Sequence, residues 1–180
     1  MLVLSDTNIL SSLAAGKGFH LLKALFPKTV IYIPPAVEKE LQIGLAGGKT
    51  HLDIVLQAID SDNLRVLKLS RKEKQIAQTL PQKLNDGECE AIALAQNRKG
   101  RLLSNDKRAV RYCQKKRIKV VNLPNLLRLL WTRRIVSQDE VRLLLKTMKD
   151  VENLTLSQKT LDEIFAPIPR RQHPRRRRKP

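Results

Sequence analysis

NDGECEAIALAQNRKGRLLSND (residues 85–106) joins a helical pattern to a short apolar strand. AIALA (91–95) is too continuously apolar for a surface helix, which predicts a buried helix over about 86–98. RLLS (101–104) then predicts a strand, and Asp106 follows it closely. A helix that leads into a buried strand is the repeating unit of a parallel α/β sheet.

The same alternation extends outward over most of the chain. Strands are expected at about 2–5, 29–33, 64–68, 101–104 and 118–121. Helices are expected at about 8–14, 18–26, 35–46, 51–60, 71–79, 86–98 and 107–116. These patterns predict a three-layer α/β/α fold around a central parallel sheet of about five strands. Right-handed crossovers restrict the topology further.

After the fifth strand the pattern becomes entirely helical. We expect an α/β domain over 1–135 and a helical extension over 136–166 packed on it. Within 123–166 the expected helices are 123–133, one that starts after Ser137, and 157–165. Ser137 with Glu140 has the spacing of a capping box. Residues 167–180 form an Arg-rich tail that we expect to be disordered when free.

Composition favours a polyanionic partner. The chain has 180 residues and a net charge of +18, and residues 170–180 carry seven cations and no acid. This excess favours nucleic acid. Aromatic residues make up only 3% of the chain, which argues against RNA-binding modules that stack bases on aromatic side chains. Two unpaired cysteines, no secretory signal and no apolar membrane span predict a reducing, cytoplasmic location.

Four carboxylates occupy positions that suit a metal-dependent nuclease: Asp6, Glu40, Glu90 and Asp106. Asp6 and Asp106 follow predicted strands, and ligands of open α/β sheets bind at the carboxyl ends of strands. If the first and fourth strands are neighbours, these two side chains converge. Oxygen ligands in such a cluster suit Mg²⁺ or Mn²⁺. Helix capping is the alternative role for both aspartates.

Two residues, Glu88 and Glu90, are candidates for the third metal-binding carboxylate. Glu90 opens the buried AIALA run, where an uncompensated charge is costly. Glu88 has a capping explanation, because Asn85 precedes it by three residues. We therefore expect Glu90 to be the metal ligand, with Glu88 as an additional or substitute ligand.

A basic run borders the expected site. Residues 98–119 hold ten cations and a single acid, Asp106. Phosphate contacts position a nucleic acid on its protein. The expected substrate-positioning residues are Asn8, Asn105, Lys107, Arg108 and Arg111. The expected phosphate contacts of the tail are Arg170, Arg171, Arg175, Arg176, Arg177, Arg178 and Lys179.

SDTN (5–8), PPAVEKEL (34–41), GECEAIALA (87–95) and SND (104–106) together resemble the PIN-domain ribonucleases, especially the VapC-like toxins with a GEAEAIALA-type motif. The resemblance covers about residues 1–125 and fades beyond about 135. It implies that Asp6, Glu40, Glu90 and Asp106 bind the metal, and that Asn8 is the small polar residue near the first aspartate. It also implies a metal-dependent endoribonuclease. If the chain belongs to a toxin–antitoxin pair, the expected partners are RNA and a small antitoxin, with a homodimer as a further expected assembly.

Two rival functions remain on the same fold: a catalytically silent RNA-binding or scaffold module, and a DNA-directed nuclease. A nucleotide-binding loop at GGKT (47–50) is disfavoured, because Ile43 stands where the first glycine of that motif would be. The aspartyl phosphatase pattern after the first strand is also disfavoured, because its second aspartate is replaced by Asn8.

Overall fold

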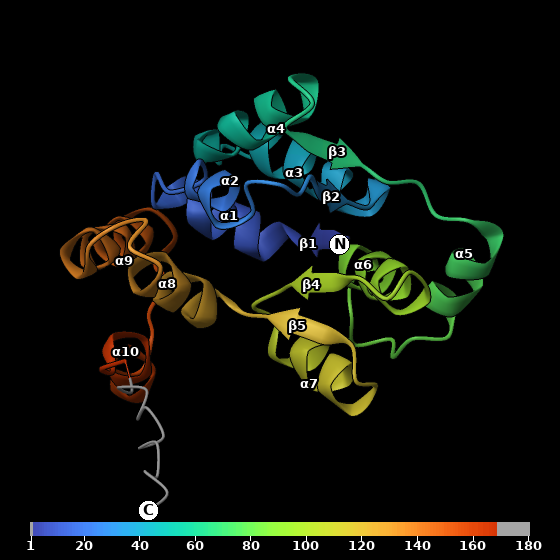
Figure 1. The fold of residues 1–180 in the computed structure, drawn as a ribbon. Coiled ribbons are helices and arrows are strands. Elements are labelled where there is room, and N and C mark those ends of the chain that lie inside the picture. Colours follow the sequence, from blue (N-terminus) through green and yellow to red (C-terminus); the bar gives the residue numbers. More distant parts are fainter. Residues whose placement is uncertain (1, 169–180) are drawn as a thin grey trace, which may run out of the picture.

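The central sheet has five parallel strands in the order β3-β2-β1-β4-β5. A computed structural model of the chain describes residues 2–168 (Figure 1). The strands are β1 (Val3–Ser5), β2 (Ile31–Ile33), β3 (Leu64–Val66), β4 (Arg101–Leu103) and β5 (Lys119–Val121). Val3 of β1 pairs with Ile31 on one side and Arg101 on the other. The predicted strands and the proximity of the first and fourth are therefore confirmed.

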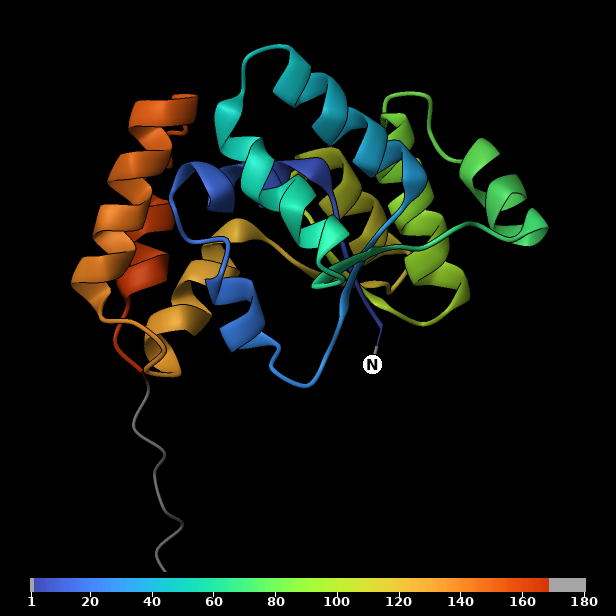
Figure 2. The same ribbon diagram turned by 90° about the horizontal axis from the view of Figure 1, so that it is seen from above.

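The helices fall within a few residues of the predicted ranges. The first group is α1 (Thr7–Ala15), α2 (Leu21–Leu25), α3 (Pro35–Ala46), the 3₁₀ turn η1 (Thr50–Leu52), α4 (Asp53–Asp60) and α5 (Arg71–Gln78). The second group is α6 (Asp86–Asn97), α7 (Lys107–Lys115), α8 (Leu123–Thr132), α9 (Gln138–Glu152) and α10 (Gln158–Phe165). These helices flank the sheet, as the α/β/α prediction requires (Figures 1 and 2).

Two hydrophobic clusters lie on the two faces of the sheet, because successive side chains of a strand point in opposite directions. Val3 and Leu103 contribute to a cluster formed mainly with α1 to α4 and α8 to α10. Leu4 and Leu102 contribute to a second cluster with α6 and α7. Burial on both faces explains why the strands are almost purely aliphatic.

Side-chain caps fix where several helices begin. The predicted capping boxes at Asn85–Glu88 and Ser137–Glu140 are both present. A third, at Ser70–Glu73, starts α5 and was not predicted. Each box satisfies backbone N–H groups that the first helical turn leaves without partners.

The C-terminal helices share the core of the α/β fold. Val141 and Met148 of α9 and Ile164 of α10 are buried in the same cluster as the helices on that face. Gly16 permits the close approach of α9, because a Cβ there would lie 2.8 Å from Cε of Met148. The indole N–H of Trp131 donates to the carbonyl of Ile164 at 2.8 Å and ties α10 to α8.

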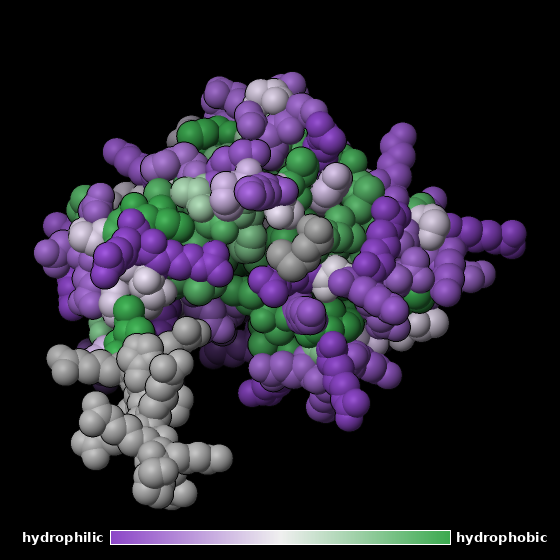
Figure 3. Space-filling model, in the orientation of Figure 1, coloured by the Kyte–Doolittle hydropathy of each residue, from purple (hydrophilic) through white to green (hydrophobic). Residues whose placement is uncertain are grey.

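Hydrophilic side chains cover α5, α6 and α7 on the face shown in Figure 3, and hydrophobic residues gather near its centre. Within residues 2–168, no helix has both the length and the apolar character needed to cross a bilayer. The predicted tail contacts from Arg170 to Lys179 lie outside the described residues.

Candidate active site

Asp6 and Asp106 lie at the carboxyl ends of the two central neighbouring strands. Asp6 directly follows β1, and its backbone N–H donates to the carbonyl of Leu103 in β4 at 3.0 Å. Asp106 follows β4 after a buried serine, Ser104, whose hydroxyl accepts from the Asp106 N–H at 3.3 Å. The sheet register therefore brings the two aspartate positions to one edge.

Asp6 is a buried carboxylate with one unsatisfied oxygen. The residue is 2% exposed. Its Oδ1 accepts from the N–H of Ile9 at 2.9 Å and caps α1, whereas its Oδ2 is buried without a hydrogen-bond partner among the described residues. Burial raises the pKa of Asp6 to about 6, although the Ser104 hydroxyl and the backbone N–H groups of Ile9 and Asn105 lower it; the negative charge of Asp106 makes a smaller contribution to the rise. Capping of α1 uses only Oδ1, so it does not explain why Oδ2 is buried without a partner in the described part of the chain.

Glu88 shares this electrostatic environment. It is buried, and its Oε2 accepts from the N–H of Asn85 at 3.1 Å in the capping box. Burial raises the pKa of Glu88 to about 7, and the negative charges of Asp106, Asp6 and Glu40 raise it further. Three other carboxylates thus lie close enough to Glu88 to disfavour its ionisation.

Glu40 is brought to the edge of this group by α3. The hydroxyl of Thr7 donates to its Oε2, and the N–H of Gly87 donates to its Oε1 at 3.3 Å. A Cβ at position 87 would lie 2.8 Å from that Oε1. The glycine before Glu88 therefore allows α6 to approach the Glu40 carboxylate closely.

Within residues 2–168, the side-chain hydrogen bond of Glu90 is made to the backbone and not to this group. Oε2 of Glu90 accepts from the N–H of Ala36 at 2.9 Å, at the start of α3. Glu90 also lines a separate pocket of about 530 Å³ with Lys39 and Lys74. Residues two apart on a helix differ by about 200°, so Glu88 and Glu90 cannot face the same carboxylates. The cost of burying a charge falls on Glu88, the more buried of the two.

A polar cleft of about 850 Å³ opens beside Asp106. Oδ1 of Asp106 accepts from the N–H groups of Arg108 and Ala109 at 2.7 and 2.8 Å, so Asp106 caps α7. Four of the predicted substrate-positioning residues line the cleft with it: Asn8, Asn105, Lys107 and Arg108. Arg111, the fifth, is exposed on α7 and is not among the lining residues.

Two cations of the basic run have structural partners: Arg108 donates from its guanidinium to the carbonyl of Lys83 at 3.0 Å, and Arg98 pairs with a buried acid. Nε of Arg98 donates to Oε1 of Glu73 at 2.7 Å, and Glu73 is fully buried. This guanidinium holds the pKa of the Glu73 carboxyl well below its usual range, and backbone and side-chain donors at Ser70 and Asn97 assist. Arg98 therefore ties α6 to α5.

The chemistry of these four carboxylates suits a divalent cation, but their side chains are not arranged as a complete metal site. Their ligand atoms are all oxygens, and the buried Oδ2 of Asp6 lacks a partner within residues 2–168. Hard cations such as Mg²⁺ prefer such oxygens. Among the described residues, however, no three His, Cys, Asp or Glu side chains are gathered as a ready metal-binding set. A bound cation would require small side-chain adjustments.

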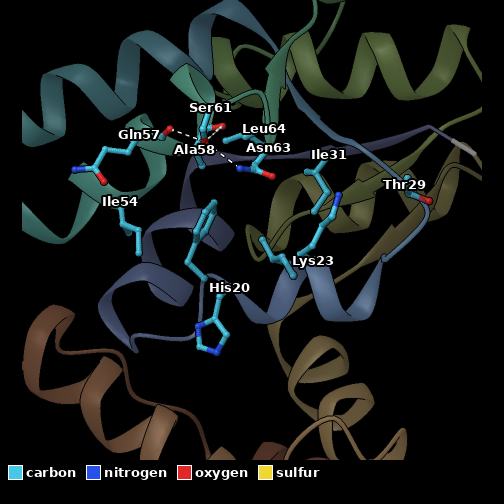
Figure 4. Close-up of a pocket in the computed structure, with 12 residues that line it drawn as sticks. His20, Lys23, Thr29, Ile31, Ile54, Gln57, Ala58, Ser61, Asn63 and Leu64 are labelled. Carbon is cyan, nitrogen blue, oxygen red and sulfur yellow. Dashed lines mark hydrogen bonds between the residues drawn. The ribbon is translucent and has the colours of Figure 1, made fainter.

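A more apolar cavity of about 490 Å³ lies elsewhere on the fold (Figure 4). Ile31 and Leu64, which line it, are the first residues of β2 and β3. The cavity is therefore near the amino ends of parallel strands, whereas the aspartates follow the carboxyl ends. It is separate from the carboxylate group.

Comparisons with known proteins agree with this architecture. A family model described as PIN domain matches residues 2–168. The match continues through α9 and α10, beyond the position near residue 135 where the resemblance was expected to fade. A solved structure, VapBC2 from Rickettsia felis bound to a DNA fragment from their promoter, contains a chain with the same fold at a TM-score of 0.50. The two chains are 21% identical, and the alignment covers 68% of this chain and 98% of the other. A comparison with curated proteins finds no match.

Proposed function

This chain belongs to the PIN-domain family, whose members are generally nucleases, and we propose that it is a divalent-metal-dependent endoribonuclease. The proposal specifies hydrolysis of RNA phosphodiester bonds with Mg²⁺ or Mn²⁺, and a role as the toxin of a toxin–antitoxin pair. Family membership supports the nuclease class, the oxygen ligands of the site support a divalent metal, and the similarity to VapBC2 motivates the toxin role.

The observation that carries the proposal is the unpartnered oxygen of Asp6. A buried carboxylate oxygen without a hydrogen bond is costly, and nearby carboxylates increase that cost. The oxygen lies where β1 and β4 end, beside the cleft in which a ligand of an open α/β sheet is expected. A cation at this point would offset the repulsion within the group.

We assign the metal ligands to Asp6, Glu88 and Asp106, with Glu40 at the edge of the set. This assignment replaces Glu90 by Glu88, because Glu88 is electrostatically coupled to the other three carboxylates. A divalent cation held there would act as a Lewis acid and lower the pKa of a bound water. The carboxylates would hold the cation and orient its bound water, and they would not themselves transfer protons.

The residues around the cleft would position the substrate. Lys107 and Arg108 are exposed at the start of α7, next to Asp106, where they can contact the phosphates that flank the scissile bond. Asn8 and Asn105 line the same cleft and offer amide groups to the sugar–phosphate chain. Arg111 is assigned to a more distant contact along α7.

The proposed macromolecular partners are RNA and a small antitoxin. The R. felis structure is a VapBC complex, which motivates an antitoxin for this chain as well. We propose that the antitoxin covers the carboxylate cleft, and that two copies of this chain associate. Co-expression with a neighbouring short open reading frame, followed by size-exclusion chromatography, tests both assemblies.

The tail from Arg170 to Lys179 is proposed to add affinity without sequence specificity. It carries seven cations and no aromatic residue within 170–180, so it suits phosphates rather than base stacking. Each phosphate contact on a single strand contributes about −0.7 to the slope of log affinity against log salt. If roughly four contacts form, a chain ending at residue 169 should show a slope flatter by about 3.

The central test is cleavage by the purified protein. Single-stranded RNA and DNA of the same base sequence are incubated with Mg²⁺, with Mn²⁺ and with EDTA. The proposal expects RNA cleavage that EDTA abolishes. Equal activity in EDTA contradicts the metal mechanism, and preferential DNA cleavage supports the DNA-directed alternative. Tight RNA binding without any cleavage supports the silent module.

A further inference from the structure

The cleft beside Asp106 extends to a second polar cluster, which α9 helps to build. Asp106 and Lys107 line one part of the cleft, Lys49 and His51 line another, and residues 151–154 at the end of α9 contribute a third wall. Its volume of about 850 Å³ falls within the range of about 300–1,000 Å³ that is usual for small-ligand pockets. The space is therefore sufficient for part of a substrate beyond the scissile phosphate.

Glu152 organises the second cluster. Its carboxylate accepts from the hydroxyl of Ser11, and from that of Ser12 at 3.2 Å. Nε2 of His51 lies 3.1 Å from Oε1 of Glu152 and 3.1 Å from Oγ of Ser11. Ser11 and Ser12 are buried, and the side chains of His51 and Glu152 are 15% and 17% exposed. Figure 2 shows the end of α9 beside the segment that joins α3 to α4.

This geometry places a proton on Nε2 of His51. An ionised carboxylate only accepts hydrogen bonds, so the ring nitrogen that faces Glu152 must be Nε2–H. In neutral histidine the other nitrogen, Nδ1, is then an acceptor. Among residues 2–168, no group hydrogen-bonds to Nδ1. A Ser–His–acid relay does not fit, because Ser11 and Glu152 both contact the same nitrogen.

The charges around the cleft suit a nucleotide. Lys49, Lys107 and Arg108 are exposed cations on its walls. The acids among the lining residues are Asp106, in the carboxylate group, and Glu152, which is already hydrogen-bonded. Phosphates are thus matched by cations on both sides. The acceptor on His51 requires a ligand that donates a hydrogen bond, and the ribose 2′-hydroxyl is such a donor.

We propose that this part of the cleft is a ribonucleotide subsite next to the scissile phosphate. Nδ1 of His51 accepts a hydrogen bond from the 2′-hydroxyl, Lys49 contacts a flanking phosphate, and Glu152 is a positioning residue that fixes the ring of His51. The inference rests on the proposed function for the place of the subsite in the reaction. It makes the extension helix α9 part of RNA recognition and names a residue that distinguishes RNA from DNA.

The test measures binding in EDTA, so that neither cleavage nor metal loading contributes. Fluorescently labelled single-stranded RNA and DNA contain only A and C, which gives them identical bases. Affinities are compared at one salt concentration for the full chain and for His51→Gln, Glu152→Gln, the double variant and Lys49→Ala. Glutamine at position 51 keeps an N–H donor for Glu152 but lacks Nδ1. Lys146→Ala, an exposed cation of α9 that does not line the cleft, is the matched control for Lys49→Ala.

For the wild-type chain we expect tighter binding of RNA than of DNA. His51→Gln should reduce this preference about fivefold, the usual size of one lost hydrogen bond. Glu152→Gln should reduce it by less, because the glutamine oxygen still accepts from Nε2–H. The double variant should lose no more than His51→Gln, because Glu152 acts through His51. Lys49→Ala should weaken the binding of RNA and of DNA equally. The loss should be larger than that caused by Lys146→Ala. Replacing single riboses by deoxyribose should locate one sensitive position that His51→Gln makes insensitive.

An unchanged RNA-to-DNA ratio in folded His51→Gln overturns the subsite, even if the wild-type chain cleaves RNA. Additive losses in the double variant overturn the positioning role of Glu152. Should Glu152→Gln fail to fold, the His51 and Lys49 variants and the deoxyribose scan still decide the proposal. Absence of RNA cleavage by the wild-type chain contradicts the proposed function separately, because the binding comparison does not depend on it.

Discussion

Asp6 and Glu73 are both almost completely buried, yet the pKa values of their carboxyl groups are shifted in opposite directions. Glu73 is 0% exposed and Asp6 is 2% exposed. The pKa of Glu73 is held well below its usual range by Arg98, whereas burial raises the pKa of Asp6 to about 6. Burial penalises the charge in both places, but at Glu73 the guanidinium of Arg98, with donors at Ser70 and Asn97, more than offsets that penalty.

The comparison distinguishes a structural carboxylate from a functional candidate. Glu73 accepts from Arg98, Asn97 and the backbone of Ser70, and it joins α5 to α6. Asp6 keeps an unpartnered oxygen among other carboxylates. Buried charges without local compensation are concentrated at functional sites, because structural stability alone does not favour them.

The largest expected effect is loss of activity when the unpartnered carboxylate is neutralised. Asp6→Asn and Asp106→Asn should each reduce RNA cleavage by about 10²–10³, because each removes a ligand charge from the proposed cation that would stabilise the developing charge. In EDTA, Asp6→Asn should not lower the free energy of unfolding, because it removes an uncompensated buried charge. Steady-state cleavage and urea denaturation measure the two effects. A nearly active, strongly destabilised Asp6→Asn would make Asp6 a structural carboxylate like Glu73.

The converse change is Arg98→Met. It should lower the free energy of unfolding by about 2–3 kcal/mol, somewhat less than a fully buried broken pair, because Arg98 is partly exposed and Asn97 still donates to Glu73. RNA cleavage at a temperature where the variant is folded should be nearly unchanged. Urea denaturation and cleavage assays provide both measurements, with Lys99→Met as a neighbouring exposed control. A stable Arg98→Met would weaken the contrast between the two sites.

A change of pH should alter the stability contributed by the Asp6–Glu88 region and by Glu73 in opposite directions. The folded pKa values of Asp6 and Glu88 are raised to about 6 and about 7, so their favourable contribution is present at low pH and is lost as pH rises from about 4 to 7. Glu73 has a lowered pKa, so its contribution is present above its unfolded value and is lost on acidification. Without metal, the free energy of unfolding should therefore fall between pH 5 and pH 8, by at most about 4 kcal/mol if the two shifts add.

Divalent metal provides the control for this pH dependence. Mn²⁺ should stabilise the fold more at pH 8 than at pH 5, because protons compete for the same carboxylates. Urea denaturation at both pH values, with EDTA or Mn²⁺, measures this. The double variant Asp6→Asn, Glu88→Gln should show a flatter pH profile and a smaller Mn²⁺ effect. An equally steep profile in that variant would assign the titration to other groups.

The smallest effect concerns the choice between Glu88 and Glu90. Glu88→Gln should reduce RNA cleavage about tenfold more than Glu90→Gln, a size within the range for perturbed metal sites. Glu88 is coupled to Asp6 and Asp106, whereas Glu90 accepts from the Ala36 N–H. Parallel measurement of Mn²⁺ affinity checks that the difference arises at the metal. The opposite ranking would restore the expectation from the sequence.

Local patterns were sufficient for the fold. The five strands follow from short aliphatic runs such as TVIYI (29–33), because burial on both faces leaves little room for polar residues. Helix starts follow from cap residues such as Asn85 and Ser137. The position of Asp6 opposite Asp106 follows from the placement of both after strands that pair in parallel.

The site was less predictable where side-chain direction or distant contacts decide it. The apolar run after Glu90 suggested that Glu90 faces the core, but the rotation of α6 buries Glu88 instead. Glu152 meets His51 across 101 residues of sequence and Ser11 across 141. Such contacts have no local pattern. The hydrophobic face of α9, with Val141 and Met148, was the available signal that this helix packs on the fold.

The placement of Glu152 also has a consequence for the order of events during protein synthesis. Except for the adjacent Asn153 and Leu154, every other residue that lines the cleft precedes Glu152 in the chain. A ribosome therefore completes both strand-end aspartates long before it adds the helix that orients His51. Chains fold from the N-terminus as they emerge. A nascent chain would possess its carboxylates while one wall of its substrate cleft is still missing, and docking of α9 would be the step that completes the enzyme.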